Sequence, residues 1–105
     1  MSIIVVYPKE VFGEAEDLVM HIDIEERAGA TIPEYLDLVF RMMNAVDGSL
    51  TEWYLRQYQC RSMSVGDLVK ILDQWFIVRP IGWGKIDAPD EIARLDQLVK
   101  DKTNV

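Results

Sequence analysis

This chain of 105 residues is half hydrophobic and 28% charged, and its formal net charge is −7. The length favours one domain over residues 1–105, with a core between about residues 3 and 100. No apolar run is long enough to span a bilayer, and no signal peptide is visible. Cys60 is the only cysteine. The sequence therefore argues against a membrane protein or a disulfide-bonded secreted one and predicts a cytoplasmic protein. Residues 1–52 hold eleven Asp/Glu and three Lys/Arg, an acidic balance that argues against direct binding to nucleic acid.

The N-terminal third predicts two strands joined by a polar loop. Ile3–Tyr7 is a β-rich run that predicts a central strand. Lys9–Asp17 is polar and predicts a loop with one helical turn. Leu18–Ile24 alternates between apolar and polar positions, which predicts a half-buried strand with His21 on its exposed side.

Thr31–Val46 gives the strongest helix prediction. Thr31 and Glu34 form a capping box, and Gly48 follows the expected end. The apolar stripe of this helix is very wide. A helix with such a stripe either lies deep in the core or contacts a partner. Because a chain of this size cannot cover such a helix all round, we favour self-association, with Phe40 and Met42 as contact candidates.

Two more helices are predicted further along the chain. Ser49 begins a short one that runs to about Tyr58, and its aromatic face includes Trp53. Core packing explains that face better than nucleic-acid stacking, because only two arginines accompany it. The last helix begins at Pro89, and its packing stripe consists of Ile92, Leu95, Leu98 and Val99.

Between these helices the sequence predicts a β-hairpin. Leu68–Leu72 and Trp75–Val78 are apolar runs separated by Asp73-Gln74, a weak turn pair that leaves turn type and register open. Both runs are apolar on both faces, which is typical of strands that are covered on both sides or carry an interaction surface. Trp83 then lies in a Gly-Trp-Gly turn, where it either plugs the end of the core or is an exposed anchor for a partner.

No catalytic, metal or cofactor site is apparent. Ser62–Asp67 has neither the spacing of a phosphate loop nor that of a nucleophile elbow, and it reads as a tight turn that leads into a strand. His21 is the only histidine and has no evident catalytic or metal-binding partners. An enzyme would need Ser62, Ser64, Asp67 and His21 to cluster, so we predict a protein that is not an enzyme and binds no cofactor.

The run RSMSVGDLV at residues 61–69, followed by Ile81-Gly82-Trp83, resembles the signature of YodL-like small proteins and domains. Val6-Tyr7 and the segment from Leu38 to Gly48 resemble other parts of that family, so the likeness covers about residues 5–86 and is specific at 61–69. Such proteins are common on bacterial plasmids and phages. The resemblance implies a mobile genetic element as the setting, and it carries over no functional residues.

The sequence therefore predicts an α+β fold, in which helices pack on a mainly antiparallel sheet of about four strands that includes a C-terminal β-hairpin. The first functional hypothesis is a non-enzymatic protein-interaction module. It binds another protein, or a second copy of itself as a homodimer, and it does not bind a membrane. Its contact candidates are Phe40, Met42, Trp53, Trp75 and Trp83.

The alternative hypothesis is an acidic DNA mimic, of the anti-restriction or anti-CRISPR type, that inhibits a host defence or DNA-handling enzyme. This hypothesis rests on the acidic N-terminal half together with the mobile-element setting. The candidate acidic surface consists of Glu14, Glu16, Asp17, Asp23, Glu25 and Glu26.

Overall fold

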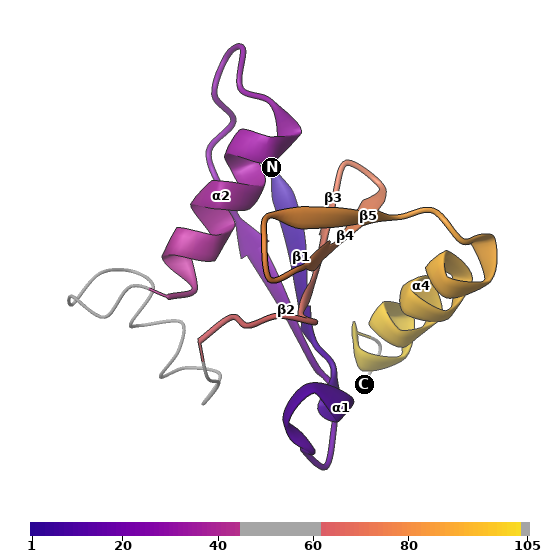
Figure 1. Cartoon of the computed structure of the whole chain (residues 1–105). Coiled ribbons are helices and arrows are strands. Elements are labelled where there is room, and N and C mark those ends of the chain that lie inside the picture. Colours follow the sequence, from indigo (N-terminus) through magenta and orange to yellow (C-terminus); the bar gives the residue numbers. More distant parts are fainter. Residues whose placement is uncertain (45–61, 104–105) are drawn as a thin grey trace. The chain divides into compact units, whose positions relative to one another are not determined.

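The computed structural model describes residues 1–44 and 62–103 (Figure 1). The chain divides into two compact units: unit 1 contains Met1–Ile24 and Val65–Val105, and unit 2 contains Glu25–Ser64. Unit 2 is therefore an insertion between two strands of unit 1. The expectation that residues 1–105 form one domain stays a prediction.

Unit 1 is built on a five-stranded antiparallel sheet with the order β2-β1-β3-β4-β5. This confirms the α+β prediction, with one strand more than expected. The bounds are Ser2–Tyr7 for β1, Leu18–Asp23 for β2, Leu68–Ile71 for β3, Gln74–Val78 for β4 and Trp83–Ile86 for β5. A short helix, α1 (Lys9–Phe12), lies in the β1–β2 connection where the sequence predicts a helical turn.

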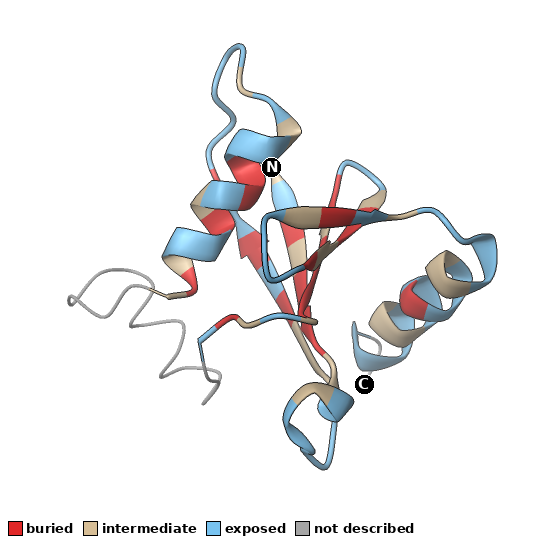
Figure 2. Cartoon of the chain, viewed as in Figure 1, coloured by how far each residue is buried: buried red, intermediate tan, exposed pale blue. Residues whose placement is uncertain are grey.

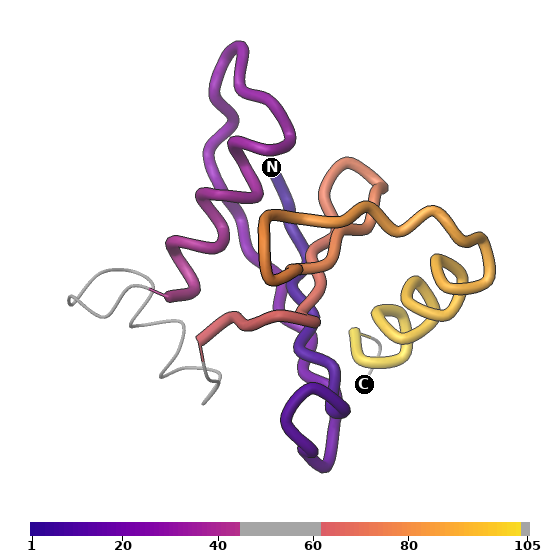
Figure 3. The backbone as a smooth tube through the Cα atoms, viewed as in Figure 1, coloured from indigo at the N-terminus to yellow at the C-terminus, as the bar shows by residue number. Residues whose placement is uncertain are grey.

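The two strands that flank β1 are parallel to each other, because each pairs with β1 in antiparallel fashion. Strand β2 ends beside the start of β1, whereas β3 starts beside its end, as the pairs Ser2↔Asp23 and Val6↔Leu68 show. Figure 3 shows the antiparallel course of β1 and β2. The insertion therefore leaves and rejoins the sheet at opposite ends. Such a crossover needs a dozen residues or more, which explains why a helix-bearing segment fits here.

Helix α4 (Pro89–Thr103) packs on one face of the sheet, called the α4 face below. Its buried Leu95 joins Val6, Leu68 and Trp75 in a core cluster. Half-buried apolar side chains surround this cluster: Ile4, Val19, Ile77, Ile86, Ile92, Leu98 and Val99. The predicted stripe of the last helix is thus its packing surface, as expected from its 3.6-residue period.

The opposite face, called the far face below, is also apolar and buried (Figure 2). Alternation along the strands places on it Ile3, Val5, Tyr7, Met20, Ile22, Val69, Ile71, Phe76 and Val78, each at most 8% exposed. Strands β3 and β4 are therefore buried on both faces, which accounts for their nearly continuous apolar sequence.

The β3–β4 turn differs from the expected Asp73-Gln74. The two turn residues are Leu72 and Asp73, with φ of +49° and +62°, and Gln74 already pairs with Ile71. Positive φ at both positions of a two-residue hairpin loop is the type I′ geometry, whose twist matches the flanking strands. Leucine rarely adopts this conformation, so the turn is strained at Leu72.

Strand β5 was not predicted from the sequence. Trp83 is its first residue and pairs with Val78, rather than being displayed from a turn. Gly84 is buried because the Arg79 guanidinium lies over it, so that a Cβ at Gly84 would clash with Arg79 Nε. Glycine in a strand interior often marks such a close approach.

Unit 2 contains α2 (Ile32–Met42), which begins where the capping box predicts. The Thr31 side chain accepts a hydrogen bond from the Glu34 amide and donates one to Glu34 Oε1. The Tyr35 hydroxyl bridges back to the backbone of Arg27, accepting from its N–H at 2.9 Å and donating to its carbonyl at 3.3 Å. Together these contacts fix the loop that leads into the helix.

Helix α2 ends earlier than the predicted Val46, because its last turn tightens at Met43 and Asn44. The Asn44 amide donates to the Arg41 carbonyl only three residues back, and asparagine favours local bonding over helix continuation. Val46, Gly48, Cys60, Trp53 and the predicted helix that begins after Ser49 lie outside the described residues.

Candidate functional site

Three connections of unit 1 lie at the same end of its sheet. The end of β1 lies beside the start of β3 through the pair Val6↔Leu68, and the start of β3 lies beside the end of β4 through Leu68↔Ile77. The connections at this end are therefore α1, the loop before β3 and the β4–β5 turn.

Local geometry holds α1 against the loop before β3. The Lys9 amide donates to Asp17 Oδ1 at 2.8 Å, which closes the α1 connection. A Cβ placed on Gly66 would lie 3.0 Å from Val11 Cγ2, so Gly66 allows the two connections to approach. Two hydrogen bonds define a β-bulge at Gly66 and Asp67: the Gly66 amide donates to the Val78 carbonyl, and the Val78 amide donates to the Asp67 carbonyl.

These connections present large apolar side chains to solvent. Phe12 is 59% exposed, Val65 51% and Ile81 93%; these three residues are called the apolar end below. Each one directly precedes a glycine with positive φ, at +65°, +97° and +70° respectively. The turn geometry that each glycine allows holds the preceding side chain out of the core.

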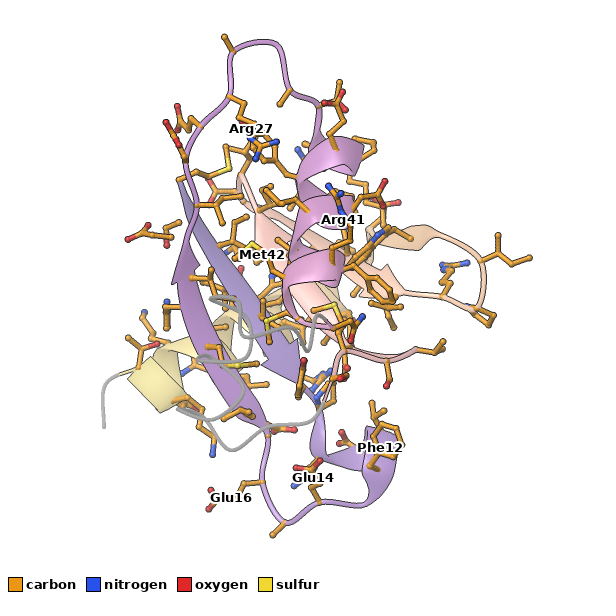
Figure 4. The ribbon with its side chains drawn as sticks, turned by 90° about the vertical axis from the view of Figure 1, so that its left-hand side faces the viewer. Phe12, Glu14, Glu16, Arg27, Arg41 and Met42 are labelled. Atoms are coloured by element: carbon orange, nitrogen blue, oxygen red, sulfur yellow. The ribbon has the colours of Figure 1, made fainter. Side chains whose placement is uncertain are left out.

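Acidic residues border the apolar end on the α1 side. The β1–β2 connection contains four acids and one lysine, and Figure 4 shows Glu14 and Glu16 on the same connection as Phe12. Glu16 is paired, since Lys102 Nζ of α4 lies 3.8 Å from Glu16 Oε2. The connection thus carries the exposed Phe12 together with partly neutralised acids.

The contact candidates from the sequence lie in different places. Phe40 is 37% exposed and Met42 (Figure 4) is half-buried, and both belong to the last turn of α2. Trp83 is half-buried in β5. Trp75 is only 1% exposed, so it is a core residue of unit 1, and we remove it from the contact candidates. Trp53 lies outside the described residues.

The acidic candidates of unit 1 lie near both ends of β2. In unit 1, Glu14 and Glu16 are exposed and Asp17 is half-buried before β2 begins, whereas Asp23 is exposed where β2 ends. A strand of this length separates its ends by about 17–20 Å. Glu25 and Glu26 are exposed in unit 2.

A polar cluster links the sheet to α4. Lys70 Nζ and Trp75 Nε1 both donate to Asp96 Oδ1, at 2.7 Å and 3.0 Å, and Lys70 Nζ lies 5.7 Å from the centre of the Trp75 ring. The hydrogen bond from Lys70, assisted by the one from Trp75, holds the pKa of the Asp96 carboxyl below its usual range. The cluster fixes α4 on its face of the sheet.

Two residues of the enzyme hypothesis, His21 and Asp67, lie on opposite faces of the unit 1 sheet. His21 lies on the α4 face, where its Nε2 is 3.0 Å from Thr103 Oγ1. Asp67 is fully buried next to Leu68, and alternation places it on the far face. Ser62 and Ser64 belong to unit 2. Across residues 1–44 and 62–103, no group of three His, Cys, Asp or Glu side chains could hold a metal ion.

No protein-family model, curated protein or solved structure matches this chain. Among the described residues, no helix is both long enough and apolar enough to cross a membrane.

Sequence reasoning missed the apolar end, although a signal was present. Helix and strand patterns assign apolar residues to faces, and Phe12, Val65 and Ile81 stand in turns, where no face is defined. The signal is an apolar residue followed by glycine in a predicted turn, which occurs as Phe12-Gly13, Val65-Gly66 and Ile81-Gly82.

Proposed function

We propose that this chain is a protein-interaction module of a plasmid or phage, related to YodL-like proteins, that acts by binding another protein and not by catalysis. The observation that carries the proposal is the apolar end. Single exposed apolar residues are ordinary on protein surfaces, but Phe12, Val65 and Ile81 are exposed on three connections at the same end of the sheet, and such an end is a candidate contact site.

The partner follows from the chemistry of this surface. Phe12, Val65 and Ile81 are exposed apolar side chains of the kind that interfaces bury, and the half-buried Trp83 begins the strand that follows Ile81. Aromatic residues are enriched among those that dominate binding energies. The acids of the β1–β2 connection favour a partner with basic residues around an apolar contact.

The acidic DNA-mimic alternative receives less support. A mimic needs carboxylates spaced along one surface in place of phosphates, whereas the unit 1 acids lie at the two ends of β2 and Glu16 faces Lys102. We therefore keep it as the second outcome of the experiment below.

The test is affinity capture from a bacterial host lysate with the full chain as bait. Wild type is compared with a double variant, Phe12→Ser with Ile81→Ser, which removes the two most exposed side chains of the apolar end. We expect wild type to retain a protein at high salt and the variant to lose it, because apolar contacts are not weakened by screening.

Leu72→Ser is the matched control, because Leu72 is 56% exposed in the turn at the opposite end of the β3–β4 hairpin. Equal loss with this control would show that overall surface hydrophobicity, not the apolar end, causes capture. A DNA-handling enzyme that is released at high salt from both wild type and the double variant would refute the proposal in favour of mimicry.

A further inference from the structure

The sheet of unit 1 has two edge strands, β2 and β5, and they differ in a way that bears on self-association. Strand β5 has four residues and includes Gly84 and Lys85. A short edge with a lysine is the usual protection against pairing with another chain. Strand β2 has six residues, LVMHID, with neither proline nor lysine, and its charge is confined to Asp23 at the end.

The direction of the β2 backbone groups can be worked out from its first ladder pair. Met1 and Ile24 exchange both hydrogen bonds, since each donates its N–H to the carbonyl of the other. In an antiparallel ladder such pairs alternate with pairs that exchange none. With the register Ser2↔Asp23 to Tyr7↔Leu18, the even-numbered residues of β2 bond to β1, and Val19, His21 and Asp23 direct their N–H and C=O groups outward.

We propose that the outer edge of β2 pairs with β2 of a second copy of this chain, in antiparallel orientation about a twofold axis at His21. This inference goes beyond the proposed function and uses a different surface. In the described part of the chain no strand lies beyond β2, so its outward groups can act as a template for a further strand.

The self-complementarity of this register argues for a second copy rather than an unrelated strand. With His21 opposite His21 of the other copy, Val19 lies opposite Asp23, so all three outward residues of each strand form hydrogen-bonded pairs. The only charged residue of β2 meets a valine, and no acid faces another acid. A register shifted two residues toward the N-terminus would set Asp17 against Asp23, and the opposite shift would bring Glu25 against Val19.

The side chains also agree with this pairing. A twofold axis perpendicular to the sheet keeps equivalent faces on the same side, so Met20 meets Ile22 on the far face and Val19 and His21 lie on the α4 face. Opposite pairs of β-branched and other apolar residues stabilise antiparallel strands. Because each copy carries a net charge of −7, association should strengthen with added salt, unlike binding that depends on opposite charges.

The experiment measures the mass of the full chain by sedimentation equilibrium from micromolar to millimolar concentration. We expect wild type to approach twice the mass of one chain, with a larger dimer fraction at high salt. His21→Pro should be monomeric throughout that range, because it removes an outward N–H while the ladder to β1 keeps all its bonds. His21→Thr is the matched control: it loses the imidazole and keeps the N–H, and it should dimerise like wild type.

Amide hydrogen exchange of the wild-type chain supplies a second readout that needs no variant. Dilution should speed exchange at Val19, His21 and Asp23, and leave Met20 and Ile22 unchanged. A wild-type chain that is monomeric at every concentration would overturn the proposal, and so would a folded His21→Pro variant that still dimerises. The Phe12→Ser, Ile81→Ser double variant should dimerise normally, which separates failure here from failure of the proposed function.

Discussion

Asp96 accepts two hydrogen bonds from the sheet, and replacing it tests how α4 is held. In Asp96→Ala, the indole N–H of Trp75, whose side chain is 1% exposed, loses its acceptor, and Lys70 loses its partner. A hydrogen bond to a charged group contributes about 1.5–3 kcal/mol. Alanine returns about 0.5 kcal/mol of helix propensity. The free energy of unfolding should therefore fall by about 1–2 kcal/mol.

Two controls separate the indole bond from the ion pair. Lys70→Met removes the ammonium and leaves the Trp75 to Asp96 bond; the pair is partly exposed, at 21% and 45%, so its loss should cost at most about 1 kcal/mol. Asp96→Asn keeps an acceptor for the indole and removes the charge. We expect the order of stability to be wild type, then Lys70→Met and Asp96→Asn, then Asp96→Ala.

The assay is urea denaturation followed by tryptophan fluorescence, with indole N–H exchange measured by NMR. The Trp75 indole proton should exchange slowly in wild type and in Lys70→Met, and quickly in Asp96→Ala. The reasoning is refuted if Asp96→Ala lies within about 0.5 kcal/mol of wild type, which is the size of an ordinary surface substitution, or if Lys70→Met costs as much as Asp96→Ala.

The same cluster predicts a dependence of stability on pH. The pKa of Asp96 in the folded chain lies below its ordinary value of 3.8 because Lys70 and Trp75 donate to the carboxylate. A lowered pKa contributes stability above the unfolded value, and that contribution is lost as the pH falls from 3.8 through the folded value. Urea titrations of wild type and Asp96→Asn should therefore converge in acid, and a constant difference down to complete protonation would contradict the assignment.

Three further variants test the fold, each by urea denaturation. Replacing Leu72 by Asn and Asp73 by Gly should raise stability by about 1–2 kcal/mol, because both positions require positive φ; a loss would show that the turn is not type I′. Gly66→Ala should cost about 2 kcal/mol, since alanine is strained at φ +97° and its Cβ would press on Val11; an unchanged midpoint would argue against the bulge. Leu95→Ala should cost about 2–5 kcal/mol as a core cavity, whereas a cost below about 1 kcal/mol would mean that α4 is loosely docked.

The sequence was enough to predict those elements whose stabilising contacts join residues only a few positions apart in the chain. The start of α2 follows from Thr31 and Glu34, which bond to each other within one turn. The alternation of β2 follows from burial on one side, with Met20 and Ile22 buried and His21 exposed. In such segments, residues a few positions apart carry the whole signal.

The β3–β4 turn was misplaced because distant contacts decide its register. Asp73-Gln74 is a reasonable turn pair by composition, but it would set Leu72 opposite Trp75. The observed register sets Lys70 opposite Trp75, so that both reach Asp96 on α4. The strain at Leu72 is local, and the contacts that outweigh it come from a helix more than twenty residues away.

Strand β5 was missed for a related reason. Its sequence WGKI has a glycine in the interior and follows Gly82, which argues locally for a turn. Pairing with β4 and packing of the Arg79 side chain over Gly84 stabilise β5, although its interior glycine lowers its β propensity. Gly84→Ala would push a single exposed arginine aside, which is why this glycine constrains the strand less than Gly66 constrains its bulge.

The two proposed surfaces lie at different parts of the sheet, which makes their relation measurable. The apolar end is formed by connections around β1, β3 and β4, whereas the dimer edge runs along β2. Only the α1 connection touches both, because it joins β1 to β2 and carries Phe12. If dimerisation and capture are independent, His21→Pro will capture the same protein as wild type with equal affinity. If the second copy contributes to the partner site, the monomeric variant will bind more weakly although Phe12, Val65 and Ile81 are intact, and the loss will measure that contribution.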